Sequence, residues 1–455
     1  MKAPEDPLPG GMPVRGSAAA APVPLMSEMR VAVIAAVLVT IGPVSLAMYT
    51  PAMPALVEAF GTTETLVKTT ITVFFFGFAF SQLICGPLSD AYGRRPVALG
   101  FFAAYLAGSL VAVTSTTMEW LIAGRLLQGI GCAAGIAISR AIVRDQYVGQ
   151  ASARIMNLVG TMLAIAPAIS PTLGGMVLSF LDWRSIFAIM CIYGVVLMGM
   201  LAVFVPETNR SKDPSRVSPA GMLRSYGELL SSRSFMRAGL VIGGVLGGIY
   251  TLAALAPFVL IDTVGLSPVQ FGLAMLMQTG AFMAGTLVAG RLLKRLNAMR
   301  LILPGLLLVL CGAAGLGIGL RLFQPTVVTV MGPVALWALG VALVMPGCTT
   351  SALSGFPHIA GAASALTGFM QIGGGMCGTF VALMFPSPLA ALMSLLPLMG
   401  LVAVAAHILL RPVEGGQIAV SAPVDPTDIE LAADPLGVVG AAGDEIEAKT
   451  FNQKG

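Results

Sequence analysis

Three charges stand close together between two long apolar runs, in the stretch GPLSDAYGRRP that begins at Gly86. Gly86 and Gly93 supply the backbone freedom that a tight turn between antiparallel helices requires. Asp90 can pair with an arginine or accept hydrogen bonds at a helix N-terminus, and Arg94 and Arg95 can anchor the turn at a membrane surface. The stretch therefore predicts either a functional charge network or a basic loop that only fixes the orientation of the chain.

Arg125 is the second candidate, because it lies several residues inside another apolar run, LIAGRLLQGIGCAAG. An arginine at the centre of a membrane helix costs about 2.5–3.5 kcal/mol on insertion scales. Such a residue faces the interior of a helix bundle or a wet cavity, whereas one nearer the helix end can extend to the interface. We expect Arg125 to face the interior, with Gln128 one turn along the same helix.

The composition indicates that membrane helices must position these residues. Of the 455 residues, 56% are hydrophobic and 10% are charged, whereas soluble domains are about a quarter charged. The net charge of +4 is too small to indicate nucleic acid as a partner. Six cysteines without paired spacing and two histidines without a zinc motif indicate no disulfide framework, no metal site and no cofactor.

Apolar runs of the length that crosses a bilayer, roughly 20 residues, recur along the chain. In hydrocarbon each run must be helical, because only a helix satisfies its own backbone groups within one segment. The predicted fold is therefore an all-α membrane protein with twelve transmembrane helices. They lie near residues 31–56, 66–89, 97–115, 120–142, 153–179, 185–205, 237–261, 270–292, 300–320, 325–347, 359–384 and 387–410.

The longest interior polar segment divides these runs into two groups of six. Weak repetition supports the division, because MYTPAMPALVEAFGTTETLV in the first group and LAALAPFVLIDTVGLSPVQF in the second both pass through proline to a glycine. Two pseudo-symmetric six-helix bundles with a pathway between them are expected. The predicted units are a disordered N-terminal tail at 1–30, bundles at 31–205 and 237–411, a cytoplasmic linker loop at 206–236 and an acidic disordered tail at 412–455.

Lysine and arginine gather in the loops on one side of the predicted bundle. If both termini lie on that side, the opposite loops keep only Lys68, Arg184 and Arg321. The positive-inside rule assigns the basic side to the cytoplasm. We therefore expect a multi-pass protein of the inner membrane with both termini in the cytoplasm.

With the runs placed, two motifs resemble those of the major facilitator superfamily. The pattern G-x-L-S-D-x-x-G-R-R is similar to the loop motif between its second and third helices, and R-L-x-Q-G-x-G resembles its fourth-helix motif. The first resemblance implies that the acid and arginines of the loop, with its glycines, form an interhelical network that holds the two halves in the outward-facing state. The second implies a role for Arg125 and Gln128 in proton transfer.

The fifth run, AIAPAISPTLGGM, places three small residues four positions apart, with Pro167 and Pro171 removing bonds from the helix ladder. The residues alone predict close helix packing or a hinge against the other half. The run is similar to the antiporter motif G-x-x-x-G-P-x-x-G-G, matched at Pro171, Gly174 and Gly175, with Ser170 at one of two replaced glycines. That resemblance implies a drug and proton antiporter rather than a sugar symporter.

The segments MYTPAMPAL and FLDWRSIF resemble the bicyclomycin-resistance branch of these exporters (Bcr/CflA), over residues 31–410. That branch usually carries an aspartate where this chain has Ala47, and no Asp or Glu stands in the middle of a predicted helix. Proton coupling needs a carboxylate whose pKa responds to the substrate. Three explanations stay open: Asp262 enters the cavity from a helix end, Asp90 and Arg125 carry the coupling, or coupling is weak.

We therefore expect a monomeric secondary transporter, not an enzyme, that exports small amphiphilic compounds such as drugs in exchange for protons, surrounded by membrane lipid. A cavity without an acid should favour neutral or weakly anionic amphiphiles over cations. Its candidate lining residues are Tyr49, Met53, Phe75, Gln82, Tyr250 and Gln371. An exporter of a sugar or metabolite is an alternative, as is a polytopic membrane enzyme, which would need clustered acids or histidines, or an ion channel, which would need a repeated filter.

Overall fold

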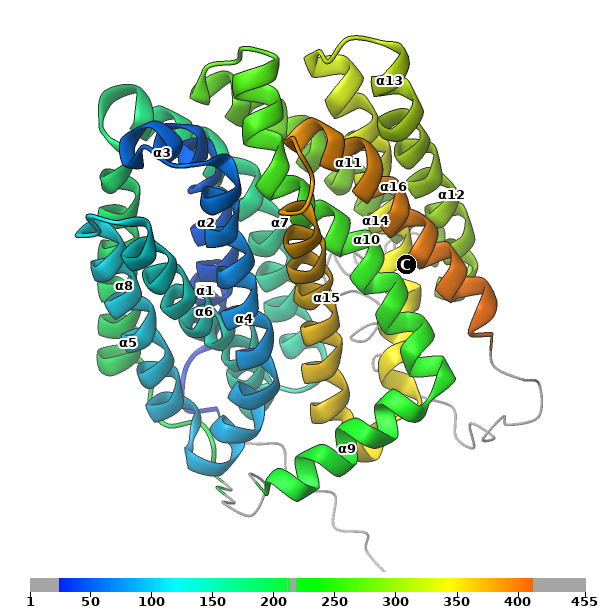
Figure 1. The fold of residues 1–455 in the computed structure, drawn as a ribbon. Helices are drawn as coiled ribbons and strands as arrows, with labels where there is room; N and C mark the ends of the chain where they lie inside the picture. Colours follow the sequence, from blue (N-terminus) through cyan, green and yellow to red (C-terminus); the bar gives the residue numbers. More distant parts are fainter. Residues whose placement is uncertain (1–23, 211, 213–217, 412–455) are drawn as a thin grey trace, which may run out of the picture.

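The computed structural model describes residues 24–210, 212 and 218–411, so the acidic tail and most of the predicted N-terminal tail lie outside the described residues. Within these ranges the chain forms helices and no strand. Figure 1 shows the long helices running between two ends of one bundle, with a short helix lying across one end. The first helix begins at Glu28, so the last residues of the predicted N-terminal tail belong to the bundle.

The first half contains six crossings. The first is built from four short pieces and contains three prolines, Pro43, Pro51 and Pro54, whereas each of the others is one continuous helix. Its elements are α1 (Glu28–Val39), α2 (Ile41–Ala47), η1 (Thr50–Ala52), α3 (Met53–Phe60), α4 (Glu64–Tyr92), α5 (Arg94–Val113), α6 (Met118–Gln146), α7 (Gly149–Phe180) and α8 (Trp183–Phe204).

The second half repeats this plan after a linker. Serine and threonine caps start most of its helices, since their hydroxyls accept from the free N–H groups of the first turn. Its elements are α9 (Pro219–Ser231), α10 (Arg233–Pro257), η3 (Phe258–Thr263), α11 (Pro268–Leu293), η4 (Ala298–Leu301), α12 (Ile302–Ala314), η5 (Gly315–Gly319), α13 (Leu320–Leu322), α14 (Val327–Ser354), η6 (Pro357–Ile359), α15 (Ala360–Ala382) and α16 (Pro388–Leu409).

Eleven helical segments among the described residues are long and apolar enough to cross a membrane, one fewer than predicted. The missing one is α15, which has 23 residues but carries six glycines that lower its hydropathy. It packs between α4 and α10 in the middle of the molecule. Close packing against neighbouring helices, which small residues permit, therefore holds α15 in the position of the eleventh of the twelve predicted crossings.

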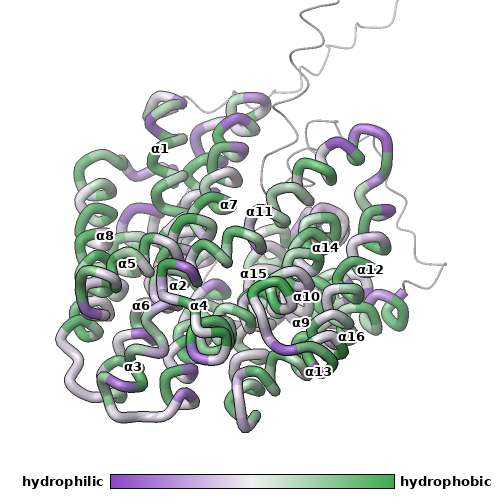
Figure 2. The backbone as a smooth tube through the Cα atoms, turned by 90° about the horizontal axis from the view of Figure 1, so that it is seen from above, coloured by the Kyte–Doolittle hydropathy of each residue, from purple (hydrophilic) through white to green (hydrophobic). Residues whose placement is uncertain are grey.

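Each half has its own apolar core. One core is built almost wholly from α1–α8 and the other from α9–α16. Trp337 lies in the second core, where its indole Nε1 donates to the carbonyl oxygen of Val245 at 2.9 Å. Figure 2 shows the two groups of helices side by side. Packing of α4 on α15 and of α7 on α11 joins the halves, so the two halves meet along few helices.

The weak sequence repeat corresponds to a repeated backbone feature. The first crossing ends at Gly61 with φ of 57°, and the seventh ends at Gly265 with φ of 84°. Both angles lie in the left-handed region that favours glycine. The prediction of two related six-helix bundles is confirmed by this arrangement and by the separate cores.

The two ends of the bundle differ in charge. We call the end that carries the α4–α5 turn and α9 the basic end, and the end that carries Gly61 and Gly265 the opposite end. The described termini both lie at the basic end, because the backbone N–H of Leu25 donates to Gln146 of α6 at 2.8 Å and Arg237 of α10 donates to the carbonyl of His407 of α16 at 3.0 Å.

The predicted linker loop contains a helix, α9, which the sequence prediction missed. Ser218 caps it, Pro219 stands at its first turn and Leu229 is buried. The hydroxyl of Tyr226 donates to the carbonyl of Leu83 in α4 at 2.8 Å, and burial raises the pKa of Tyr226 to about 12, so the hydroxyl keeps its proton at neutral pH. Helix α9 thus connects the second half to the first at the basic end.

Candidate functional site

A cavity of about 640 Å³ lies between the two halves, within the range of roughly 300–1,000 Å³ that small-molecule sites occupy. In the middle of the molecule its wall includes Ala47 and Phe75. At the basic end it includes Asp145 of α6 and Tyr226 of α9. The cavity therefore extends from the centre of the bundle to the basic end.

Backbone contact between α7 and α11 closes the opposite end. A Cβ atom at Gly175 of α7 would lie 2.2 Å from the carbonyl oxygen of Pro268, and one at Gly272 of α11 would lie 2.4 Å from the Cα of Thr172. No side chain fits at these distances, so this contact requires glycine on both helices. Two residues of the predicted antiporter hinge, Pro171 and Gly175, therefore lie where one half touches the other.

The other predicted hinge residues lie on the same helix. Gly174 rests on the backbone of the first crossing, since a Cβ there would lie 2.3 Å from the carbonyl of Met48, and Ser170 donates to the carbonyl of Ala166 at 2.6 Å. Pro167 lines the cavity. Helix α7 stays continuous through both of its prolines, so a helix break at these positions is absent in this conformation.

Four of the six predicted cavity residues line it. Phe75 of α4 faces Tyr250 of α10 with ring centroids 5.3 Å apart, and Gln371 of α15 donates to the Tyr250 hydroxyl at 3.2 Å. Gln82 also lines the wall. Residues from both halves therefore meet across the cavity.

The prediction for Tyr49 and Met53 is wrong in this structure. Both side chains are fully buried in the core of the first half. The break between α2 and η1 turns Tyr49 inward, where its hydroxyl lies 2.7 Å from that of Thr70. The breaks in the first crossing change which side chains face the cavity. A prediction that assumes one regular helix does not take this change into account.

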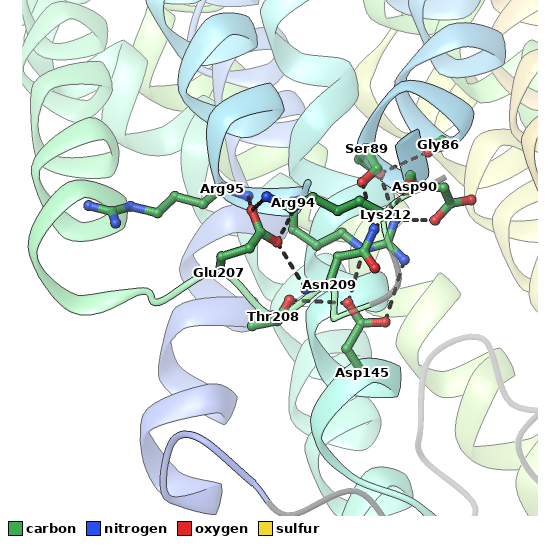
Figure 3. Close-up of polar contacts among 10 residues, drawn as sticks. All are labelled: Gly86, Ser89, Asp90, Arg94, Arg95, Asp145, Glu207, Thr208, Asn209 and Lys212. Atoms are coloured by element: carbon green, nitrogen blue, oxygen red, sulfur yellow. Dashed lines mark hydrogen bonds and ion pairs between the residues drawn. The ribbon is translucent and has the colours of Figure 1, made fainter. Parts of the chain in front are cut away.

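Asp90 of the loop motif and Asp145 of α6 converge on Arg94 (Figure 3). Its guanidinium contacts Asp90 of α4, donates to the Ser89 hydroxyl at 2.8 Å and places Nε 3.0 Å from a carboxylate oxygen of Asp145 on α6. The Arg94 side chain is 12% exposed, so its ion pairs are screened less than surface pairs. The network joins α4, α5 and α6 within the first half.

The segment after α8 caps both helices of the motif, and the sequence prediction did not identify it. Glu207 accepts from the backbone N–H of Arg94 at 2.9 Å, which places a negative charge at the N-terminus of α5. Asn209 donates to the carbonyl of Asp90 at 2.8 Å, in the last turn of α4. Figure 3 shows the two side chains on either side of the turn. Their partners stand more than a hundred residues away in the chain, which left no local signal.

The remaining motif residues have distinct places. Gly93 has φ of 112°, a backbone conformation that favours glycine, and a Cβ there would also displace the Glu207 carboxylate, 2.3 Å away. Gly86 lines the cavity. The Arg95 side chain extends to the carbonyl of Ala202 in α8 and lies outside the Arg94 network.

Arg125 is fully buried and bonds to no carboxylate in the described part of the chain. Its guanidinium carbon lies 4.4 Å from the ring centre of Tyr49 and 4.3 Å from that of Phe74, and Nη1 donates to Gln128 at 2.8 Å. In the described part of the chain, its Nε and Nη2 atoms have no hydrogen-bond partner. Because Phe74 also lines the cavity, one aromatic ring separates this cation from it.

Asp262 lies away from the cavity. It belongs to η3 at the opposite end, where its side chain is exposed, and it does not line the cavity wall. In this conformation the expected entry of Asp262 into the cavity is not seen.

Two arginines that the sequence prediction did not select line the cavity, Arg140 and Arg144 of α6. Neither has a hydrogen bond or ion pair to another described residue, whereas both acids of the cavity wall, Asp90 and Asp145, bond to Arg94. A cation near the basic end of an apolar run gives the same signal as any topology-setting residue. The sequence alone therefore could not show that Arg140 and Arg144 line the cavity.

Most helices of the two bundles are long and apolar, and the bundles lie around a shared cavity. This arrangement defines a multi-pass membrane transporter. The model of the Major Facilitator Superfamily matches residues 35–379, and the chain belongs to that superfamily.

Relatives and solved structures agree with this assignment. The chain is 30% identical over 345 residues to a chloramphenicol resistance protein of Pseudomonas aeruginosa, covering 74% of this chain and 80% of that protein. It is 28% identical over 374 residues to multidrug resistance protein D of Escherichia coli, covering 81% and 92%. Among solved structures, the xylose transporter XylE from E. coli has a TM-score of 0.65 at 14% identity, covering 84% of this chain and 97% of that one.

Proposed function

We propose that this protein exports small amphiphilic compounds from the cytoplasm across the inner membrane, in exchange for protons and as a monomer. The observation that carries the proposal is a cavity lined by both halves that reaches the basic end and is closed at the opposite end by α7 and α11. The positive-inside rule assigns the basic end to the cytoplasm, along with both termini. A compound would then enter from the cytoplasm and leave when the halves rock.

The cavity wall supports an amphiphilic compound over a sugar. Much of its deep part is lined by apolar and aromatic side chains, among them Leu46, Phe78, Ile249 and Met275, with a few uncharged polar ones such as Gln278 and Gln371. A sugar would need a hydrogen-bond partner for each hydroxyl, because an unpaired polar group costs free energy in an apolar site. The names of the resistance-protein relatives point in the same direction.

Proton coupling in this proposal depends on Arg125 and the Arg94 network. Among the described residues no carboxylate lines the deep part of the cavity, because the two acids of the wall, Asp90 and Asp145, stand at the basic end. The buried cation of Arg125 is separated from the cavity by the ring of Phe74, and Asp90, Arg94 and Asp145 line the cavity at the basic end. Asp262 lies apart from both.

Everted membrane vesicles test the export and its coupling together. The lumen is acidified by respiration, and chloramphenicol, 1-naphthylacetate or tetraphenylphosphonium is added while lumenal pH is followed. We expect proton release with the neutral and anionic compounds and none with the cation. Release with none of the three in vesicles that contain the protein, or release with tetraphenylphosphonium alone, would contradict the proposal.

Replacing Asp90 by Asn should slow transport by at least about tenfold, because it removes a charge-assisted bond to Arg94 at the edge of the cavity. The measurement is the initial rate of proton release in the same vesicles, at equal protein content. Glu228→Gln is the matched control, since Glu228 pairs with His358 at the same end with both side chains half exposed. Full transport by the Asp90→Asn variant would reduce the motif to a topology signal.

A further inference from the structure

Among the described residues, the basic end of the cavity carries more arginines than acids, and two of the arginines have no ion-pair partner. Five charged residues line it there: Arg94, Arg140, Arg144, Asp90 and Asp145. Arg94 bonds to both acids. Arg140 and Arg144 therefore face the cavity without a neutralising partner among the described residues.

Arg140 is the deeper of the two and is half-buried. It stands four residues from Arg144, so the two side chains share one face of α6 and repel each other. Charges that leave water are ordinarily paired, because an unpaired one costs solvation free energy. Two like charges on one wall of a cavity form a site that an anion would stabilise.

The wall one turn deeper than Arg140 is apolar. Ile136 and Ala137 of the same helix line it, and the aromatic pair of Phe75 and Tyr250 lies further in. The cavity wall is thus basic at Arg140 and apolar further in. A molecule with one anionic group and an apolar body would match both parts of this wall. A guanidinium binds a planar carboxylate through two parallel hydrogen bonds, and it also binds the oxygens of a sulfonate.

We propose that Arg140 is the anion-binding residue of the cavity and that the substrate is an amphiphilic organic anion with a carboxylate or sulfonate head. The inference rests on the proposed export function and names its substrate class. The anionic head lies against Arg140, with Arg144 at the cavity entrance, and the apolar body lies toward Phe75 and Tyr250. A cation is repelled at the same place, and no acid of the deep wall attracts it.

Binding to the purified full-length protein in nanodiscs of neutral lipid tests this proposal without requiring transport. Three probes share one ring system: 1-naphthylacetate is an anion, 1-naphthylacetamide is neutral and 1-naphthylethylammonium is a cation. We expect the anion to bind most tightly. Arg140→Gln should weaken binding of the anion by at least about tenfold and leave binding of the amide unchanged.

Arg140→Lys should retain part of the affinity, since it keeps the charge and loses the paired geometry. The matched control is Arg300→Gln, an exposed arginine of η4 that does not line the cavity, and it should bind all three probes as the wild type does. Equal weakening of anion and amide by Arg140→Gln would overturn the proposal, and so would unchanged binding of the anion. Loss of naphthylacetate binding in phosphatidylglycerol nanodiscs would assign the site to a lipid head group instead.

The vesicle assay separates this inference from the proposed function. Arg140-dependent binding of the anion without any export would leave the anion site standing and refute export. Export of chloramphenicol together with naphthylacetate binding that ignores Arg140 would refute the anion site and leave export standing.

Discussion

Gly175→Ala should hold the opposite end of the bundle open and stop transport. The added methyl group would lie 2.2 Å from the carbonyl oxygen of Pro268, so the contact between α7 and α11 cannot form as it does here. Overpacking of this kind costs about 1–3 kcal/mol. Because about 1.4 kcal/mol shifts an equilibrium tenfold, the conformation closed at the opposite end should become a minor one.

Labelling of a single cysteine at Ala47, in a background that lacks the native cysteines, measures the effect. Ala47 lines the cavity, so a membrane-impermeant maleimide should reach it from the basic end in the wild type and from the opposite end in the variant. The control is Gly280→Ala on α11, where an added Cβ meets nothing within 4 Å. Wild-type labelling and transport in Gly175→Ala would show that closure does not depend on this contact.

Arg125→Met should abolish proton-coupled transport while leaving the protein as stable as before or more so. The guanidinium is fully buried, and two of its nitrogens have no partner among the described residues. A buried charge without a counterion costs solvation free energy, and methionine removes that charge while filling most of the same volume. A cation kept at that cost indicates a functional role. The measurements are proton release in vesicles and the melting temperature in detergent.

Gln128→Met is the companion variant, because Gln128 accepts from Arg125 at 2.8 Å and donates to the Ser109 hydroxyl at 2.8 Å. It should slow transport less than Arg125→Met, since the stacking of Arg125 on Tyr49 and Phe74 remains. Undiminished proton release in Arg125→Met would remove the arginine from the mechanism. A large drop in melting temperature would assign it a structural role.

Hydropathy and charge located most of the fold. The apolar runs, the division at the linker and the repeat ending at Gly61 and Gly265 were readable because length and apolarity are local properties. Helix α15 is held by packing between two neighbours, and α9 is stabilised by contacts such as Tyr226 with Leu83. The apolar run at 359–384 still predicted α15 as a crossing, whereas α9 left no mark in the hydropathy profile.

Part of the candidate site could be predicted from the sequence, because the loop motif is also a local pattern. The loop motif placed Asp90 and Arg94 together, whereas Asp145, Glu207 and Asn209 join them only through the fold. Which residues line the cavity depends on helix rotation, and the interrupted first crossing reversed the expectation for Tyr49 and Met53. Arg140 was invisible because an arginine near the basic end of a run serves topology by default.

Distances at both ends of the bundle test the central claim, that two rigid halves alternately expose one cavity. Spin labels at Val148 and Leu296 report on the basic end, and labels at Leu181 and Thr263 report on the opposite end, all at exposed positions. With a compound that the vesicles export, we predict a second population in which the basic-end distance shortens and the opposite-end distance lengthens. Two distances that stay fixed, or that lengthen together, would contradict the account.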